Sequence, residues 1–171
     1  MLQSAINYRL NKTEEELGVP VDYIRHIGRH SVSALIKFSK LQGLIDYRRK
    51  LPKEAHFVCR LVAAKSADCG SCVQIEVNLS RKAGISTELI KTVVEEKYNQ
   101  LSSDLQKVVN FTRKVLNVEH NLEEARSSLL EIYGEEAVME LCLTMSAAQF
   151  FPTVKRGLGY SVSCSKVEIE V

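Results

Sequence analysis

The sequence predicts an all-α fold, with residues 1–171 in a single domain. Nearly every segment repeats its apolar residues at helical spacing, and only three prolines and eight glycines interrupt the chain. A chain of 171 residues with 45% hydrophobic content can bury a core without disulfide staples. We therefore expect one bundle of helices joined by short connections.

The first helices are predicted before residue 50. The segment Thr13–Glu16 has the spacing of a capping box, and Gly18 and Pro20 close this short turn and open the next helix. Residues 31–47 form one amphipathic helix, which ends at the basic group Arg48–Lys50, where cations suit the helix dipole. Its apolar face holds Leu35, Phe38, Leu41 and Ile45.

Two consecutive helices are predicted in the middle of the chain. Pro52 fits the first turn of one helix, which ends at the polar residues 65–68. Its apolar positions include Phe57, Leu61 and Ala64. A second helix follows Cys69 and ends near Gly84, because a glycine suits a C-terminal cap. We expect these two helices to be antiparallel and to flank the segment Cys69-Gly70-Ser71-Cys72.

Further helices are predicted after this pair. The segment from Ser86 begins one of them, and the others cover residues 103–116, 122–133 and 135–151. Only residues 166–171, in which apolar and charged side chains alternate, have an extended pattern.

The charge balance excludes some classes of partner. The 23 basic and 21 acidic residues nearly cancel, so no single-sign field marks a binder of nucleic acid or of membrane surfaces. The start lacks the pattern of a signal peptide, and no stretch is predicted to span a membrane. We expect a cytoplasmic protein that takes a small substrate or a protein partner.

Cys69 and Cys72 form a Cys-x-x-Cys pair at the predicted start of a helix. The unpaired N–H groups and partial positive charge there favour a thiolate. One helical turn brings the two cysteines together, so the pair can close a disulfide and reopen it. The pattern predicts a redox dithiol first and inert thiols second. A metal site is the third alternative, completed by His56, Cys59 and Glu76 only if the preceding helix lies close.

Two side chains are candidates for proton transfer to the dithiol. Glu76 follows Cys72 by four residues and so lies on the same helical face, although a solvated glutamate explains it equally. His56 lies on the preceding helix, can reach the pair across the hairpin and titrates near neutral pH. Glu54 is a further candidate base, but the helix dipole also explains an acid at that position.

The remaining histidines and cysteines are not assigned to the mechanism. His26 and His30 have a spacing that permits metal binding, but no other ligand lies near them, so we expect surface or interface residues. Cys59 and Cys142 are expected in the core, and Cys164 is expected to be an accessible thiol.

Residues 54–84, with the motif Asp68-Cys69-Gly70-Ser71-Cys72-Val73-Gln74-Ile75-Glu76, resemble the AhpD-like, carboxymuconolactone decarboxylase family. The AhpD branch uses a Cys-x-x-Cys pair, with a glutamate upstream and a histidine four residues after the second cysteine. The histidine position is Glu76 here. The upstream glutamate falls at Phe57, beside His56, so this sequence exchanges the acid and the histidine between the two helices.

The resemblance implies an all-helical, homo-oligomeric alkylhydroperoxidase of the peroxiredoxin type, without a bound cofactor or metal. In this reading the enzyme reduces hydroperoxides or disulfides: Cys72 attacks, Cys69 resolves, His56 and Glu76 handle protons, and an external dithiol supplies electrons. Lactone decarboxylation is less favoured, because that branch of the family generally lacks the dithiol. The alternatives are a non-catalytic oligomeric binding module and a metal-binding protein on the same scaffold.

Overall fold

The computed structural model describes residues 2–160, and in this range every regular element is a helix. The chain begins with α1 (Leu2–Leu17), α2 (Asp22–His30), α3 (Val32–Ser39) and the single turn α4 (Gln42–Ile45). It continues with α5 (Lys53–Ser66), α6 (Gly70–Lys82), α7 (Thr87–Val94), the 3-10 turn η1 (Tyr98–Gln100), α8 (Ser103–Leu116) and α9 (Glu123–Gly157). The predicted all-α fold is confirmed, while the predicted extended segment lies outside the described residues.

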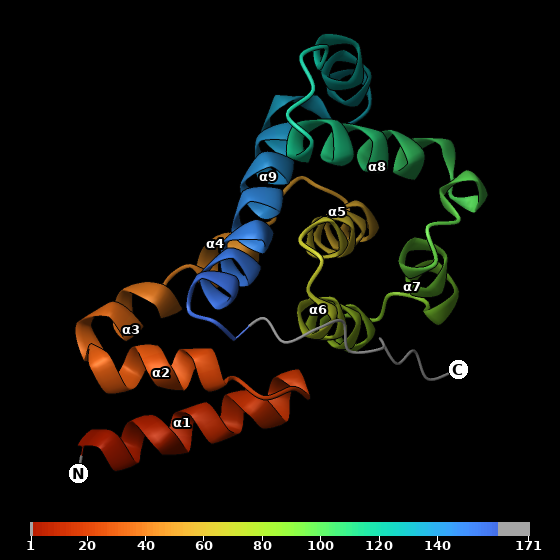
Figure 1. The fold of residues 1–171 in the computed structure, drawn as a ribbon. Coiled ribbons are helices and arrows are strands. Elements are labelled where there is room, and N and C mark those ends of the chain that lie inside the picture. Colours follow the sequence, from red (N-terminus) through yellow and green to blue (C-terminus); the bar gives the residue numbers. More distant parts are fainter. Residues whose placement is uncertain (1, 161–171) are drawn as a thin grey trace.

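Helix α5 lies in the middle of the core, and α6, α8 and α9 pack around it (Figure 1). All residues from 55 to 64 are buried, on every side of this helix. A helix that is buried all round is expected to be apolar. Two of the buried side chains, His56 and Arg60, are polar instead. Because burying a polar group costs free energy unless it finds a partner, their contacts need an explanation.

Several predicted helix ends are confirmed. Pro52 is the N-cap residue of α5, and the hydroxyl of Ser86 accepts a hydrogen bond from the N–H of Leu89 at 3.2 Å at the start of α7. Gly84 follows α6 with a φ of +78°, which glycine adopts without strain. The predicted range 103–116 matches α8.

Two predictions for the first fifty residues are wrong. Thr13 is not a cap but lies inside α1, where its hydroxyl donates to the carbonyl of Arg9 at 3.0 Å. A threonine can bond in this way in a helix interior, so capping spacing alone is ambiguous. Residues 31–47 are not one helix, because the backbone turns at Lys40 and Leu41. The N–H groups of Lys40 and Leu41 donate to the carbonyls three residues earlier, at 3.2 and 3.1 Å. This tight turn keeps the helical spacing of the apolar residues, so the sequence pattern does not reveal the break.

The basic segment before α5 is held through its backbone by Glu140 of α9. The buried carboxylate accepts hydrogen bonds from the N–H groups of Arg49 and Leu51 at 2.9 Å and from that of Lys50 at 3.1 Å. Burial works to raise the pKa of Glu140, but these N–H groups together with Arg48 hold it below its usual range. The segment predicted as a helix end therefore fastens α4 and α5 to α9.

Helix α9 combines the two helices predicted at 122–133 and 135–151 and continues to Gly157. It is kinked at Gly134, which has a φ of +78° and a ψ of 170°. Among the described helices, α9 alone is long and apolar enough to cross a membrane by length and composition, which the sequence reading did not anticipate. Half of its most apolar stretch is buried, and it contacts α4, α5 and α8, as the core helix of a soluble domain does.

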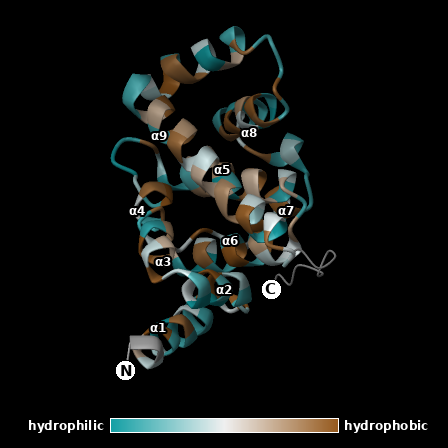
Figure 2. Cartoon of the chain, turned by 60° about the vertical axis from the view of Figure 1, so that its left-hand side comes forward, coloured by the Kyte–Doolittle hydropathy of each residue, from teal (hydrophilic) through white to brown (hydrophobic). Residues whose placement is uncertain are grey.

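Helices α1, α2 and α3 form a layer beside this core (Figure 1), and α1 extends away from the other helices in a second view (Figure 2). The side chain of Asn78 on α6 donates to the carbonyl of Leu17 at 2.8 Å and so fastens the end of α1 to the core. Gly18 is required at this junction. Its φ is +69°, and a Cβ atom there would lie 2.7 Å from the Asn78 amide nitrogen.

Candidate active site

Cys69 and Cys72 lie together at the start of α6. Cys69 is the N-cap residue, and its carbonyl accepts the first helical hydrogen bond, from the N–H of Val73 at 3.0 Å. The Cys72 sulfur, one turn further along, shares a hydrogen bond with the Cys69 sulfur across 2.7 Å, and both residues are buried. Because both sulfur atoms lie in the first turn of one helix, they can form a disulfide without a large movement of α6.

The two thiols have very different acidities. The hydrogen bond from the Cys72 thiol lowers the pKa of Cys69 to about 5, against the opposing effect of burial. The Ser71 hydroxyl and the Lys155 ammonium lower it further. The same hydrogen bond, together with burial, raises the pKa of Cys72. Because the two groups are coupled, the pair carries one negative charge and one shared proton at neutral pH.

Lys155 brings a cation to the dithiol from α9. Its ammonium donates a hydrogen bond to Ser71 Oγ, which lies 3.6 Å from Cys69 Sγ. This positive charge favours the negative charge on Cys69, and the site is partly buried, so water screens the attraction only weakly. The sequence reasoning missed Lys155, because 84 residues separate it from Ser71 and no spacing rule connects the two.

Glu76 lies one turn after Cys72, as its spacing predicts, but its carboxylate is held by Arg60 of α5. Arg60 Nε donates to Glu76 Oε2 at 2.6 Å, and Arg60 Nη1 pairs with Asp46 Oδ1 at 2.9 Å. Burial works to lower the pKa of Arg60, but both carboxylates raise it, so the guanidinium stays charged. Arg60 was not anticipated as a site residue. An arginine within an apolar helix that faces a glutamate on the next helix is the pattern that could have indicated it.

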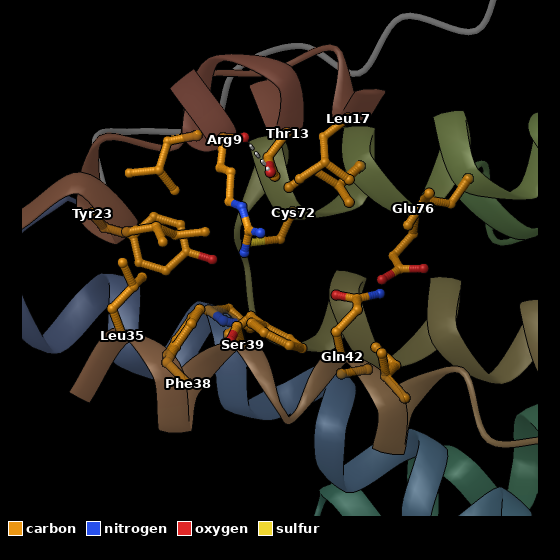
Figure 3. Close-up of a pocket in the computed structure, with 18 of the residues that line it drawn as sticks. Arg9, Thr13, Leu17, Tyr23, Leu35, Phe38, Ser39, Gln42, Cys72 and Glu76 are labelled. Atoms are coloured by element: carbon orange, nitrogen blue, oxygen red, sulfur yellow. Dashed lines mark hydrogen bonds between the residues drawn. The ribbon is translucent and has the colours of Figure 1, made fainter. Parts of the chain in front are cut away.

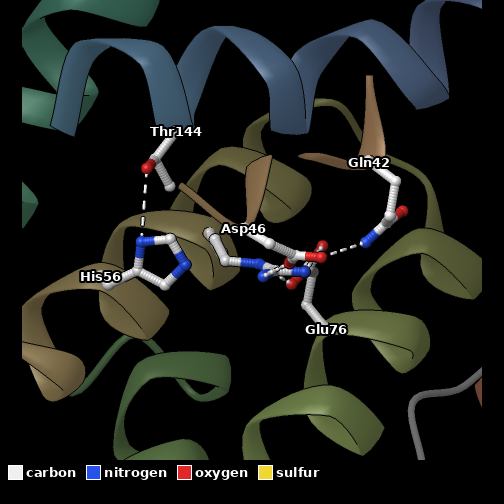
Figure 4. A network of polar contacts seen from close by, with 6 residues as sticks. Gln42, Asp46, His56, Glu76 and Thr144 are labelled. Atoms are coloured by element: carbon white, nitrogen blue, oxygen red, sulfur yellow. Dashed lines mark hydrogen bonds and ion pairs between the residues drawn. The ribbon is translucent and has the colours of Figure 1, made fainter. Parts of the chain in front are cut away.

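His56 is buried on α5, one turn before Arg60, and its Nδ1 lies 3.3 Å from the hydroxyl of Thr144 on α9 (Figure 4). Burial, reinforced by the charges of Arg60 and Arg48, lowers the pKa of His56 to about 4. The imidazole is therefore neutral at physiological pH, which differs from the titration near neutrality expected from the sequence. No hydrogen bond among the described residues joins His56 to Cys69 or Cys72.

The other candidates lie apart from the dithiol or deep in the core. Cys59 is fully buried, as predicted, and burial raises the pKa of its thiol to about 12. Cys142 is only half-buried, while Glu54 is exposed at the start of α5. The rings of His26 and His30 lie 4.4 Å apart, without further ligands, and Cys164 lies outside the described residues.

Within residues 2–160, the histidine, cysteine and acidic side chains form no group of three or more that could hold a metal ion. In particular, Glu76 is engaged by Arg60 and His56 by Thr144, so the structure does not assemble them with Cys59 around one point.

A cavity of about 670 Å³ lies between the layer of α1 to α3 and the core. Cys72, Glu76 and Arg60 are on its wall, whereas Cys69 is not. Figure 3 shows Cys72 and Glu76 on the side of α6, facing the side chains of the N-terminal helices. Most of the lining is apolar and includes Leu10, Leu17, Ile24, Val32, Leu35 and Phe38. No sequence pattern could indicate this cavity, because it forms only where distant helices meet.

The fold and the site define a class of protein: an all-helical domain with a buried dithiol at a helix start, beside an apolar cavity. Among solved structures, a cysteine-to-alanine variant of the debrominase Bmp8 in complex with 2,3,4-tribromopyrrole matches with a TM-score of 0.74. The match covers 93% of this chain and 83% of that chain, at 16% sequence identity. This likeness shows the fold alone, and the fold is the AhpD-like helical one. No family model and no curated protein matches the sequence.

Proposed function

We propose that the protein is a cytoplasmic thiol-dependent peroxidase, which reduces hydroperoxides with the pair Cys69 and Cys72. The observation that carries this proposal is the contact of the two sulfur atoms at 2.7 Å beside a cavity of about 670 Å³. A cysteine with a pKa of about 5 keeps the pair singly ionised at neutral pH, which a thiol nucleophile requires. The AhpD-like fold of the chain supports the same chemistry.

In this mechanism Cys72 attacks, because Cys72 lines the cavity and Cys69 does not. The Cys72 proton first passes to Cys69 across their hydrogen bond. The Cys72 thiolate then attacks the terminal oxygen of the hydroperoxide. The O–O bond breaks, so that Cys72 becomes a sulfenic acid and an alkoxide leaves, which takes up one proton to become the alcohol.

Cys69 completes the reaction as the resolving cysteine. Its sulfur attacks the Cys72 sulfenic acid, an S–S bond forms, and the hydroxide that leaves combines with the Cys69 proton to give water. The dithiol has lost two electrons and the O–O bond has gained them. An external dithiol then reduces the disulfide through a mixed-disulfide intermediate.

Proton transfer in this proposal depends on Cys69 rather than on His56. A base with a pKa of about 4 is mostly unable to hold a proton at neutral pH, and His56 bonds to Thr144 instead. Glu76 does not transfer a proton in this mechanism but acts through its place beside Arg60 and Cys72. Its carboxylate holds Arg60, and its negative charge adds to the effects that raise the pKa of Cys72.

Steady-state turnover tests this proposal. Consumption of cumene hydroperoxide is measured with dithiothreitol as the reductant for the wild type and for Cys69→Ser, Cys72→Ser and Cys142→Ser variants. We expect activity to be lost in the first two variants and kept in the third, whose half-buried thiol is on α9 and is not part of the pair. Wild-type turnover no faster than that of Cys72→Ser contradicts the proposal and favours a non-catalytic module. A stoichiometric metal in the untreated protein favours the metal-binding alternative.

A second candidate function is reductive removal of a halogen from an aromatic ring. The likeness to a debrominase and the apolar cavity beside Cys72 favour it. The dithiol would supply two electrons, so that a carbon–bromine bond becomes a carbon–hydrogen bond, with release of bromide and a proton and formation of the Cys69–Cys72 disulfide. Bromide release from 2,3,4-tribromopyrrole by the reduced protein tests this candidate, and Cys72→Ser serves as the control.

A further inference from the structure

The cavity beside Cys72 has walls that lack a packing partner. Leu17, Ile24, Val32 and Leu35 line it from the N-terminal layer, and all four are only half-buried. Aliphatic side chains on adjacent helices usually complete the core. An apolar body of the size of a substituted benzene ring fits the volume of about 670 Å³ and would bury these side chains.

Most polar side chains on the cavity wall already have partners. The Gln42 amide donates to Asp46 at 2.8 Å, and Glu76 is held by Arg60. Arg9 also lines the cavity but is exposed, so water can solvate its guanidinium. These groups leave one buried polar side chain to account for, which is Tyr23 of α2.

Tyr23 is only 6% exposed, and its hydroxyl oxygen, which is open to the cavity, makes no hydrogen bond within the part of the chain that the structure describes. In Figure 3 the hydroxyl points into the cavity, on the side where Cys72 lies. Burial raises the pKa of Tyr23, and the nearby sulfur atoms of Cys72 and Cys69 raise it further. The phenol is therefore neutral and keeps a proton to donate. Because the hydroxyl is open to the cavity, a ligand oxygen there can accept its hydrogen bond in place of water.

We propose that the cavity between α1 to α3 and the core is the substrate site, and that Tyr23 donates the proton to the leaving oxygen. This inference rests on the proposed peroxidase function. The apolar group of an organic hydroperoxide lies against the N-terminal helices, with its terminal oxygen at Cys72. When Cys72 attacks, the O–O bond breaks and the alkoxide takes the Tyr23 proton to become the alcohol. The resulting phenolate regains a proton from water.

Binding is tested without chemistry in a Cys72→Ser variant. The probe is 2-phenyl-2-propanol, the alcohol that corresponds to cumene hydroperoxide, and calorimetry or NMR titration follows its binding. We expect saturable binding that weakens at least tenfold when Ser39→Trp places a large side chain on the cavity wall. Ser33→Trp, exposed on the same helix and outside the lining, is the matched control. Absence of binding, or equal binding in both tryptophan variants, overturns the cavity as the site.

The role of Tyr23 is tested by single-turnover oxidation in the wild type and in Tyr23→Phe, with Tyr8→Phe as an exposed control. We expect Tyr23→Phe to slow oxidation by cumene hydroperoxide about 10²-fold, the loss typical of removing one donor from a developing oxyanion. Probe affinity should change much less. An unchanged rate overturns the role of Tyr23 while leaving peroxidase activity intact, whereas no oxidation of the wild type contradicts the proposed function itself. In that case the binding experiment still decides the site.

Discussion

At the scale of single residues, the reactivity of the dithiol depends on neighbours from distant parts of the chain. Cys69 is the N-cap residue of α6, but its low pKa comes first from the Cys72 thiol and then from Ser71 and Lys155. The charge on Cys69 in turn helps to keep Cys72 protonated until a substrate arrives. The two cysteines are therefore one acid–base unit, and a change in any of these neighbours should affect both sulfur atoms.

Replacement of Lys155 by methionine should raise the pKa of Cys69 above about 5, because a cation that lowers this pKa is lost. The measurement is the rate of iodoacetamide alkylation at Cys69 as a function of pH, read by mass spectrometry. Lys91→Met, on an exposed position of α7, is the matched control. If the midpoint of the Cys69 profile is the same in Lys155→Met and the control, the ammonium does not activate the thiol.

The buried His56 should make the protein less stable in acid. Its pKa is lowered from 6.5 to about 4, so the unfolded state binds more protons than the folded state between these pH values. The free energy of unfolding is not reduced by this group above about pH 6.5. It falls as the pH drops from 6.5 to 4, by about 3 kcal/mol in total. Urea unfolding between pH 7 and pH 4 should show a smaller loss in His56→Leu than in the exposed control His120→Leu. Equal losses would argue against a neutral, buried imidazole.

At the scale of elements, the site depends on side chains that tie helices together. Arg60 connects α5 to Glu76 on α6 and to Asp46 after α4, while Glu140 connects α9 to the segment before α5. Because the dithiol, the buried ion pair and Lys155 lie on α6, α5 and α9, the relative positions of these helices set the geometry of the site.

Glu140→Ala should lower the free energy of unfolding by at least about 2 kcal/mol, because it leaves the N–H groups of Arg49, Lys50 and Leu51 without an acceptor. Denaturant unfolding of this variant is compared with that of Glu136→Ala, an exposed position on the same helix. We expect the control to change stability by less than about 0.5 kcal/mol. A loss in Glu140→Ala as small as that of the control would contradict this account of the Glu140 contacts.

Sequence reasoning succeeded where structure is set locally. The starts of α5 and α7, the end of α6 and the bounds of α8 follow from helix caps and apolar spacing. It failed at Thr13, because a threonine with this spacing can either cap a helix or bond to a carbonyl inside one. It also failed at Lys40, because the chain turns there without changing the helical spacing of the apolar residues. Lys155, Tyr23 and the partners of His56 could not be predicted, because each contact joins residues from helices far apart in the sequence.

At the scale of the whole molecule, we expect a homo-oligomer. Large apolar side chains remain exposed on several helices, including Ile36 on α3 and Met139 and Phe150 on α9. Association would remove such side chains from water, and the resemblance to the AhpD-like family implies the same. Sedimentation velocity at micromolar concentration should show a species larger than 19.2 kDa. A single monomeric species under these conditions would contradict the expectation.

The central claim is that Cys69 and Cys72 react as a redox pair, and peptide mapping after oxidation tests it most directly. The tryptic peptide of residues 66–81 contains these two cysteines and no others. The reduced protein is treated with one equivalent of cumene hydroperoxide, unfolded in iodoacetamide and digested. The account predicts that this peptide loses two hydrogens and takes up no label, while Cys59 and Cys142 are alkylated. Recovery of the peptide with both Cys69 and Cys72 alkylated would contradict it.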